Sequence, residues 1–154
     1  MGIEIERKYL LKNDSWKKDS KGTYIHQGYL NRSEDRTVRI RIAGSNAYVT
    51  IKGKSQGISR SEFEYEIPVK DAQTMLDTLC EQTCIEKHRY QQTYGQHVWQ
   101  IDEFHGDNQG LFLAEIELSM ENEKFEIPPW IGKEVSGNPR YFNSNLSKHP
   151  FTKW

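Results

Sequence analysis

The residues of this sequence that could do chemistry are charged side chains that recur at every second position. The first set is Glu4, Glu6 and Lys8, in a stretch that reads GIEIERKYLL. Ile3 and Ile5 alternate with them, which is typical of a β-strand with one apolar face and one charged face. Such a charged face can meet bulk water, or it can meet other charges across a closed space.

The same alternation returns in six further segments, and its charges sort by segment. The cations are Lys8, Arg39, Arg41, Lys52, Lys87 and Arg89, and the carboxylates are Glu4, Glu6, Glu62, Glu64, Glu66, Asp102, Glu115 and Glu117. An eighth segment carries Gln27 and Tyr29 instead. If these faces meet, they suit a ligand that needs both signs. A polyphosphate with a divalent metal is such a ligand, because Lys and Arg bind phosphate oxygens while carboxylates hold Mg²⁺ or Mn²⁺.

Eight strands are expected to position these side chains. The alternation and the flanking Gly, Ser and Asn turn signals place them at residues 2–11, 23–31, 37–44, 47–54, 59–69, 85–94, 97–106 and 111–120. Short connections favour antiparallel pairing. The fold is therefore predicted to be mainly β within the α+β class, as a barrel or as two packed sheets.

Helices are expected in only two or three places. An apolar stripe predicts one over residues 71–83, with Asp71 as its N-cap. A short helix is expected around residues 120–126, before the two prolines at 128–129. The Asn-Pro pair at 138–139 predicts the start of another.

The pattern leaves two arrangements open. In a sandwich, the apolar faces pack together and the charged faces meet water. In a closed barrel, the charged faces line the interior. Unpaired buried charges are too costly to keep, so such an interior would stay wet and open to a ligand.

Composition excludes several classes. The 154 residues fit one domain, and four Trp, eight Tyr and six Phe argue against disorder. The net charge of −1 gives no excess of positive charge for nonspecific nucleic-acid binding. No apolar run approaches the roughly 18 residues of a membrane span, and no leader opens the chain, so a cytoplasmic location is expected.

The cysteines and histidines predict no further chemistry. Cys80 and Cys84 have no histidine partners at metal spacing, so ordinary reduced thiols near a buried helix face are expected. None of the five histidines stands at ligand spacing. His88 and His97 are expected to be packed or to face solvent.

Glu4-x-Glu6-x-Lys8 resembles the ExExK signature of the CYTH superfamily, the triphosphate tunnel metalloenzymes. Segments in the order expected of small bacterial members follow it: HQGYL, VRIR, TIKGK, SRSEFEYEI, EKHRY, IDEF, AEIEL and PPWIGKEVSGNPRYFNSNL. The resemblance covers essentially the whole chain, as a single domain over residues 1–154. It implies an eight-stranded antiparallel β-barrel, a tunnel with a charged lumen and with helices packed outside.

The resemblance also implies roles for the charged residues. Phosphate binding falls to Lys8, Arg39, Arg41, Lys52, Lys87 and Arg89. Ligands for the metal that orients the triphosphate are Glu4, Glu6 and Glu117, while Glu62, Glu64, Asp102 and Glu115 would hold a second metal or position the water. Two ions of Mg²⁺ or Mn²⁺ are expected during turnover. Glu66 lies near a strand end and is left out.

Three residues are expected to take part in catalysis. Lys87 would stabilise or protonate the departing pyrophosphate oxygen, and Glu64 would serve the water or its metal. Tyr29 would orient a phosphate, although a packing role fits it equally well. The tail with Arg140 and Tyr141 resembles the element that lies at or plugs one tunnel mouth.

The implied activity is metal-dependent hydrolysis of inorganic triphosphate. Two other enzymatic functions stay open: a class IV adenylyl cyclase, or a hydrolase of thiamine or nucleoside triphosphates. A non-catalytic polyphosphate-binding module is a third alternative, and the carboxylate set argues against it, because binding an anion requires no metal ligands. Neither nucleic acid nor membrane is expected as a partner, and a homodimer stays open.

Overall fold

The computed structural model describes residues 2–17, 21–81 and 83–154. Within these ranges lie nine strands: β1 (Ile3–Leu11), β2 (Thr23–Ser33), β3 (Arg36–Ala43), β4 (Asn46–Gly53), β5 (Ser59–Ile67), β6 (Ile85–Tyr94), β7 (His97–Phe104), β8 (Phe112–Glu117) and β9 (Ile131–Glu134). The helices are α1 (Val69–Thr78) and α2 (Asn143–Leu146), with 3₁₀ turns η1 (Gly106–Asn108), η2 (Pro139–Tyr141) and η3 (Phe151–Lys153). All eight predicted strands are present, so the mainly β prediction is confirmed.

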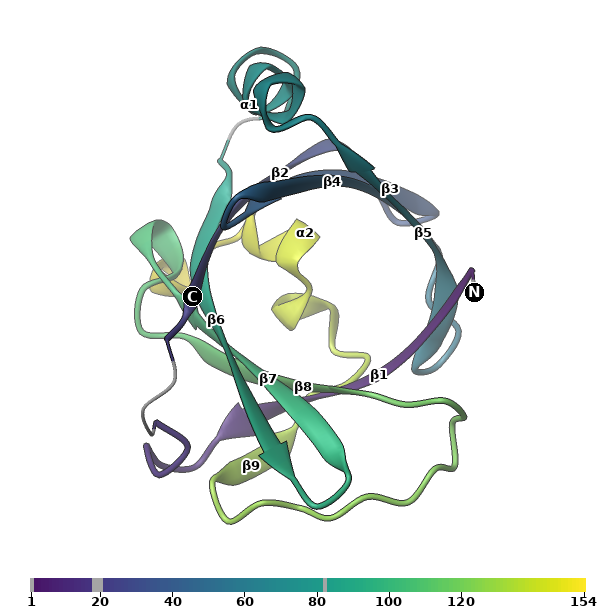
Figure 1. Cartoon of the computed structure of the whole chain (residues 1–154), viewed down its shortest axis with the longest axis vertical. Helices are drawn as coiled ribbons and strands as arrows, with labels where there is room; N and C mark the ends of the chain where they lie inside the picture. The colour runs from purple at the N-terminus through teal and green to yellow at the C-terminus, as the bar shows by residue number, and fades with distance from the viewer. Residues whose placement is uncertain (1, 18–20, 82) are drawn as a thin grey trace.

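The first eight strands close into an antiparallel barrel, which appears as a ring in Figure 1. Their order is β5-β4-β3-β2-β6-β7-β8-β1, and a second pairing of β1 with β5 closes it. That closing contact is short, since it pairs Ile3 with Ser61 and Ile5 with Ser59. A closed barrel leaves no open edge along these strands.

β9 is the strand that the sequence does not predict. It has four residues, follows two prolines and lacks an alternating pattern. It pairs with β1 beyond the β5 contact, where Leu11 lies opposite Ile131. β1 therefore pairs with β5 at its start, with β8 over Glu6–Leu10 and with β9 at its end.

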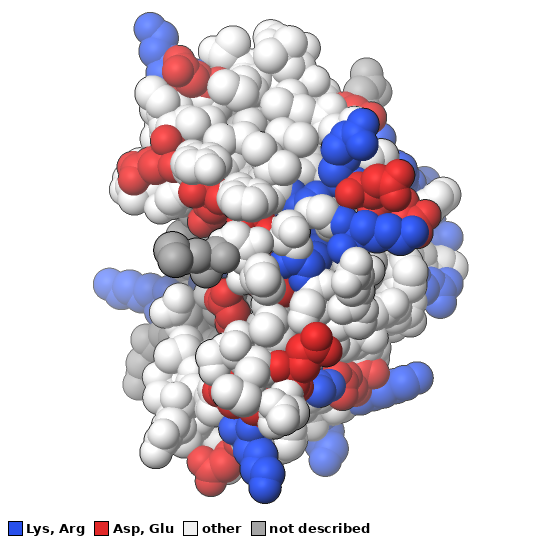
Figure 2. Space-filling view, turned by 90° about the vertical axis from the view of Figure 1, so that its right-hand side faces the viewer, with Lys and Arg blue, Asp and Glu red and all other residues white. Residues whose placement is uncertain are grey.

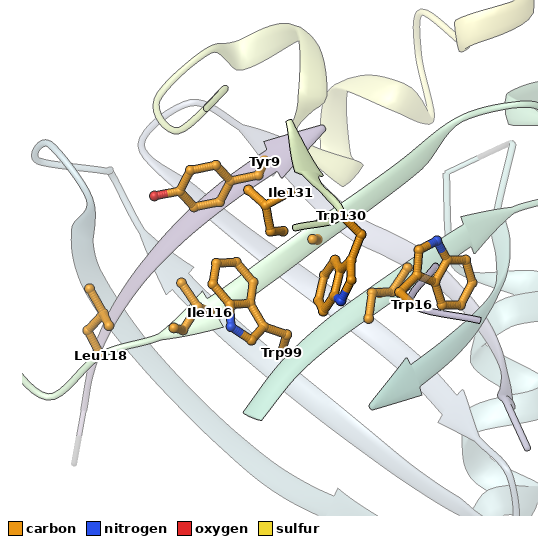
Figure 3. Packing of buried hydrophobic residues seen from close by; sticks show 9 residues of the cluster. Tyr9, Trp16, Trp99, Ile116, Leu118, Trp130 and Ile131 are labelled. Carbon is orange, nitrogen blue, oxygen red and sulfur yellow. The ribbon is translucent and has the colours of Figure 1, made fainter. Parts of the chain in front are cut away.

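The barrel carries its largest apolar core on the outside. Tyr9, Trp16, Trp99, Ile116, Leu118, Trp130 and Ile131 form one cluster over β1, β7 and β8 (Figure 3). The ring of Trp99 meets Tyr9 and Trp130 edge-on, at centroid distances of 5.5 and 5.8 Å. This packing turns the opposite, charged faces of the same strands toward the lumen.

The segment around 120–126 is not a helix, and that prediction was wrong. Ser119 donates to Glu123 Oε1 from both its backbone nitrogen and its hydroxyl, at 2.6 Å each. Phe125 then packs its ring 5.8 Å from Trp99. The strong helix formers here are overridden because the extended chain buries Phe125 and Trp130 over the barrel wall.

Helix α1 covers β2, β3 and β4 from outside, with Ala72 and Leu76 buried (Figure 1). It begins at Val69, after Pro68 at the cap position, so the prediction of Asp71 as N-cap was wrong. It ends at Thr78, and residue 82 of the predicted range lies outside the described residues. Cys80 and Cys84 are unpaired thiols packed against the α1 cluster.

The expectation of helices packed outside is only partly met. Helix α2 lies inside the ring in Figure 1 rather than against the wall. The outer face is uncovered at the start of β1 and along β5, where Ile3 and Tyr65 are 65% and 58% exposed. No helix among the described residues is long and apolar enough to cross a membrane.

The C-terminal segment of the chain enters the barrel at one end. Asn138 caps η2 by accepting from the backbone nitrogen of Arg140, with Pro139 at the first position, as predicted. Leu146 is fully buried against Ile85, Phe104 and neighbouring residues. This apolar anchor holds α2 in place at one end of the lumen.

Candidate active site

A cavity of about 640 Å³ occupies the lumen of the barrel. Its walls carry thirteen of the predicted site residues: Glu4, Glu6, Lys8, Tyr29, Arg39, Arg41, Lys52, Glu62, Glu64, Lys87, Arg89, Glu115 and Glu117. They come from seven strands and share one side of the sheet because each follows the two-residue period of its strand. Asp102 lies behind this lining, and Glu66 is outside it.

One part of the wall, on β1 and β8, is crowded with carboxylates. Glu6 lies directly opposite Glu117 in the strand register. Burial and the charges of Glu115 and Glu4 raise the pKa of Glu6 to about 8. Burial and Glu4 also raise the pKa of Glu117. No Lys or Arg of the described chain forms an ion pair with either Glu6 or Glu117, although Lys52 and Lys8 partly oppose the rise in the pKa of Glu6.

A second group of charges surrounds Lys52. Its Nζ lies 3.0 and 3.1 Å from the two carboxylate oxygens of Glu4 and 3.4 Å from Glu62. Arg60 adds a contact of 3.5 Å to Glu4. Burial opposes ionisation of Glu4, but Lys52, the hydrogen bond with Glu62 and Arg60 together outweigh it and lower the pKa of Glu4 to about 2. Burial and the bond to Glu4 raise the pKa of Glu62 to about 7.

One cation of the wall, Arg41, has no carboxylate partner among the described residues. Arg39 reaches Thr50 at 3.0 Å and Glu64 at 3.4 Å. Arg41, by contrast, donates from Nε only to the neutral Gln27 Oε1, at 2.8 Å. Burial and the nearby charge of Arg39 lower the pKa of Arg41 to about 9. Arg41 is thus a half-buried cation on the cavity wall, and its hydrogen bond from Nε goes to a neutral group.

Asp102 is enclosed by two cations. Lys87 Nζ donates to Oδ2 at 2.7 Å, and Arg89 binds both oxygens at 2.7 and 2.8 Å. Burial opposes the charge, but Arg89 and Lys87 lower the pKa of Asp102 to about 2. Burial lowers the pKa of Lys87 to about 7 although Asp102 acts against it. With both oxygens held by cations, Asp102 is placed to orient Lys87 and Arg89.

The C-terminal segment closes one end of the cavity with Phe142, Asn143 and Ser144. Lys8 Nζ donates to the backbone oxygen of Tyr141 at 3.3 Å and lies 5.8 Å from the centre of the Phe142 ring. Asn143 Oδ1 accepts from Lys87 Nζ at 2.9 Å. Arg140 turns away from the cavity, where it stacks on Trp154 at 4.1 Å.

The donor set fits a hard divalent cation. Glu6 and Glu117 supply carboxylate oxygens that form no ion pair within the described chain, and the raised pKa of Glu6 means that a proton sits where a cation could. No three Asp, Glu, His or Cys side chains of the described chain converge tightly enough to hold a metal by themselves. That agrees with Mg²⁺, which is usually held by one or two carboxylates and completed by water and substrate phosphates. Glu4 is instead engaged by Lys52.

The sequence prediction missed several residues of this site. Arg60 shares the inward stripe of Glu62 and Glu64, so the two-residue period could have found it. Gln27 was noted only as a neutral member of the second strand, yet it is fully buried between Arg41 and Tyr29. Asn143 had no usable signal, because no strand period extends into the tail.

The outer surface does not share the charge segregation of the lumen. On the face seen in Figure 2, Lys and Arg side chains are interspersed with Asp and Glu, and much of the upper half is uncharged. Outer-face pairs such as Arg7 with Glu134, at 2.8 Å, follow the same mixing. No single-sign field on this face would attract a long polyanion.

The chain is similar to known proteins over nearly its whole length. The chain is 50% identical over 151 residues to an inorganic triphosphatase from Acetivibrio thermocellus, covering 98% of this chain and 97% of the relative. It is 34% identical to an inorganic triphosphatase from Nitrosomonas europaea, covering 94% and 96%.

Solved structures share the architecture. The crystal structure of an inorganic triphosphatase superposes with a TM-score of 0.67 at 29% identity, covering 94% of this chain and 93% of the other. A protein from Hippeastrum gives 0.57 at 15% identity, covering 78% and 80%, and supports the fold alone. The family model for the CYTH domain matches residues 2–150, so this chain belongs to the CYTH family.

Proposed function

We propose that this protein hydrolyses inorganic triphosphate to phosphate and diphosphate in the lumen of its barrel. One observation carries the proposal: within the described chain, the cavity wall holds a half-buried cation, Arg41, without a carboxylate partner, and two carboxylates, Glu6 and Glu117, without an ion-pair partner. A phosphate chain with a divalent ion would satisfy both. The two relatives named as inorganic triphosphatases support this choice of substrate.

The cations divide the work of binding. Arg39, Arg41 and Arg89 would hold phosphate oxygens near the β2–β3–β6 wall, and Lys8 and Lys52 would hold them nearer β1. Tyr29 would hydrogen-bond to a phosphate oxygen beside these cations. Its hydroxyl oxygen already accepts an N–H from Gln27 at 3.4 Å, which leaves the hydroxyl proton to donate. Binding at both walls would hold the triphosphate so that the attacking water, the terminal phosphorus and the departing oxygen lie in line.

Glu6 and Glu117 would hold Mg²⁺ or Mn²⁺, with Glu4 recruited if Lys52 moves to the phosphate. Glu62, Glu64 and Glu115 would hold a second ion or position the water. The ion would neutralise charge on the phosphate oxygens and lower the cost of deprotonating the attacking water. Asp102 as a direct metal ligand would require Lys87 and Arg89 to let go of its oxygens.

The reaction exchanges one bond for another. The water oxygen bonds to the terminal phosphorus, and the bond from that phosphorus to the bridging oxygen breaks. Glu64 is oriented by Thr50, which donates to it at 2.8 Å, and would take the water proton. Lys87, with its pKa lowered to about 7, would pass a proton to the departing diphosphate oxygen.

One assay tests the proposal. Purified protein is incubated with Mg²⁺ or Mn²⁺ and, separately, with inorganic triphosphate, ATP or thiamine triphosphate, and the products are identified. Phosphate and diphosphate from inorganic triphosphate are the expected result. Cyclic AMP and diphosphate from ATP would overturn it in favour of a cyclase. Tight binding without turnover would overturn it in favour of a polyphosphate-binding module.

Three broader expectations stay predictions. They are a single domain over residues 1–154, a cytoplasmic location, and turnover with two metal ions. A homodimer also stays open.

A further inference from the structure

Asn143 has an amide whose orientation is fixed by two separate hydrogen-bond chains. Lys87 Nζ lies 2.9 Å from one terminal atom of Asn143, and an ammonium group can only donate. That terminal atom must therefore be the oxygen Oδ1. The first chain thus assigns the amide from Lys87 alone.

The second chain begins at Arg41 and reaches the same atom. Arg41 Nε can only donate, so the atom of Gln27 at 2.8 Å is its oxygen, and the other branch of Gln27 is an NH₂ group. That NH₂ group lies 3.2 Å from the same atom of Asn143, which must again accept. Both chains give the amide one orientation, with Nδ2 on the opposite branch.

The Asn143 Nδ2 group has no hydrogen-bond partner among the described residues. Three polar side-chain atoms of the described chain are fully enclosed and lack a partner: Trp16 Nε1, Arg39 Nε and Trp99 Nε1. Nδ2 of Asn143 is not one of them, so it is not fully enclosed. Asn143 lines the cavity beside Lys87 and Lys8. An accessible neutral donor therefore stands at the closed end of a lumen built for anions.

Asn143 also completes the surroundings of Lys87. The ammonium group has three hydrogens, of which one goes to Asp102 Oδ2 and one to Asn143 Oδ1. The third is left for the cavity, which Lys87 also lines. The other charged groups acting on this nitrogen are Arg89, Arg41 and Glu115.

We propose that Asn143 is a substrate-binding and positioning residue, whose Oδ1 directs the third N–H of Lys87 into the cavity and whose Nδ2 donates to a phosphate oxygen there. The C-terminal segment would thus supply part of the site rather than only close the barrel. This inference rests on the proposed function, because it takes triphosphate as the ligand and Lys87 as the proton donor.

Three variants test the proposal, with Asn143→Ala and Asn143→Asp compared against Asn145→Ala. Asn145 lies in the same turn, but its Nδ2 donates to the backbone oxygen of Pro139 and it does not line the cavity. It therefore reports what a weakened tail costs by itself. We expect Asn143→Ala to lower kcat/KM for inorganic triphosphate by roughly tenfold to a hundredfold, from the loss of hydrogen bonds to charged groups.

The aspartate variant separates the two halves of the proposal. It keeps an acceptor for Lys87 but replaces the donor with a negative oxygen, so KM should rise above that of Asn143→Ala. The alkaline limb of the pH profile of kcat should move to higher pH in Asn143→Asp and to lower pH in Asn143→Ala. If both variants match Asn145→Ala in KM and in pH profile, the proposal is wrong.

Binding to the wild-type protein gives a readout that needs neither turnover nor a variant that folds perfectly. Inorganic triphosphate is added to ¹⁵N-labelled, metal-free protein, and the side-chain amide signals are followed. The Asn143 signal, assigned by its absence in Asn143→Asp, should shift while that of Asn145 stays. A silent Asn143 signal at saturation would overturn the inference even if triphosphate is hydrolysed. A wild-type protein that binds but does not turn over triphosphate would instead refute the proposed function.

Discussion

Lys87 Nζ and Asp102 Oδ2 lie 2.7 Å apart, and each side chain is only 1% exposed. The pair is linked to the cavity through Arg89 on one side and Asn143 on the other. A fully buried ion pair of this kind is seldom retained for stability alone, because removing two charges from water costs about as much as their attraction returns. Its position behind the phosphate-facing cations points to a role in holding them.

Asp102→Asn should weaken both the fold and the site. It leaves Lys87 and Arg89 buried without a counter-charge, and breaking such a pair costs about 3–5 kcal/mol in the free energy of unfolding. The loss should also lower the pKa of Lys87 further, moving the alkaline limb of kcat to lower pH. Urea denaturation and a pH–rate profile measure the two effects. Glu103→Gln, one residue away on the outer face, should change neither by a comparable amount.

Glu6→Gln should abolish metal-dependent turnover while the fold survives, because the amide keeps the shape but loses the negative oxygen. Glu4→Gln should behave alike if Glu4 joins the metal during turnover. Phosphate release and isothermal titration with Mn²⁺ measure activity and metal affinity. Glu66→Gln is the control, since Glu66 lies on the same strand as Glu62 but outside the cavity lining. Full activity in Glu6→Gln would refute the metal-site assignment.

The stability of the metal-free protein should fall as pH rises from about 4.5 to 7. Burial and like charges raise the pKa of Glu6 to about 8 and that of Glu62 to about 7, so the folded state binds more protons than the unfolded state in this window. Below about 4.5 the direction reverses, because the lowered pKa values of Glu4 and Asp102 make folding release protons. Denaturation midpoints across this range, with and without Mg²⁺, check the prediction.

The Glu6→Gln variant isolates one part of that pH dependence. It removes the ionisation of Glu6, so its midpoints should fall less steeply with rising pH than those of the wild type. Equal slopes for the two proteins would show that Glu6 does not carry the raised pKa.

Arg60→Ala should raise KM for inorganic triphosphate by roughly tenfold with little loss of stability, from the loss of one charge-assisted contact at a partly exposed site. Arg60 lies 3.5 Å from Glu4 and 5.9 Å from the centre of the Phe142 ring, on the cavity wall. Arg7→Ala is the matched control, because Arg7 is paired with Glu134 outside the barrel. Steady-state kinetics on the two variants compare the loss of an arginine that lines the cavity with the loss of an arginine on the outer surface. Similar KM values for both would remove Arg60 from the site.

The strands were predictable because alternation is a local property. Arg39 and Arg41 stand between Val38, Ile40 and Ile42, and no helix accommodates that period. Which face of such a strand points inward is not determined locally. The same alternation is compatible with a sandwich, whose apolar faces point inward, and with a barrel that has a charged lumen. In the structure, Trp99 packs against Tyr9 and Trp130 on the outer side of the barrel. This packing places the apolar faces outside and the charged faces inside.

The parts that could not be predicted depend on contacts between distant segments. Residues 119–130 carry strong helix formers, yet Phe125 and Trp130 are held by Trp99. The placement of Asn143 on α2 depends on Lys87, which lies far away in the sequence on β6. Arg60 differs from these residues, because its position was predictable. It stands two residues before Glu62 on β5, so the same two-residue period extends to it.

The pairing of β1 with β8 sets an order for the assembly of the barrel. β1 is synthesised before the other strands, but Glu6 finds its register partner only when Glu117 has been made, after six further strands. Pairings so distant in sequence are slow to form, because the intervening loop must be closed before any contact rewards it. The nascent chain therefore carries Glu4, Glu6 and Lys8 without a lumen around them until almost all of it has been synthesised. Capture of triphosphate should accordingly be the last property to appear during biosynthesis.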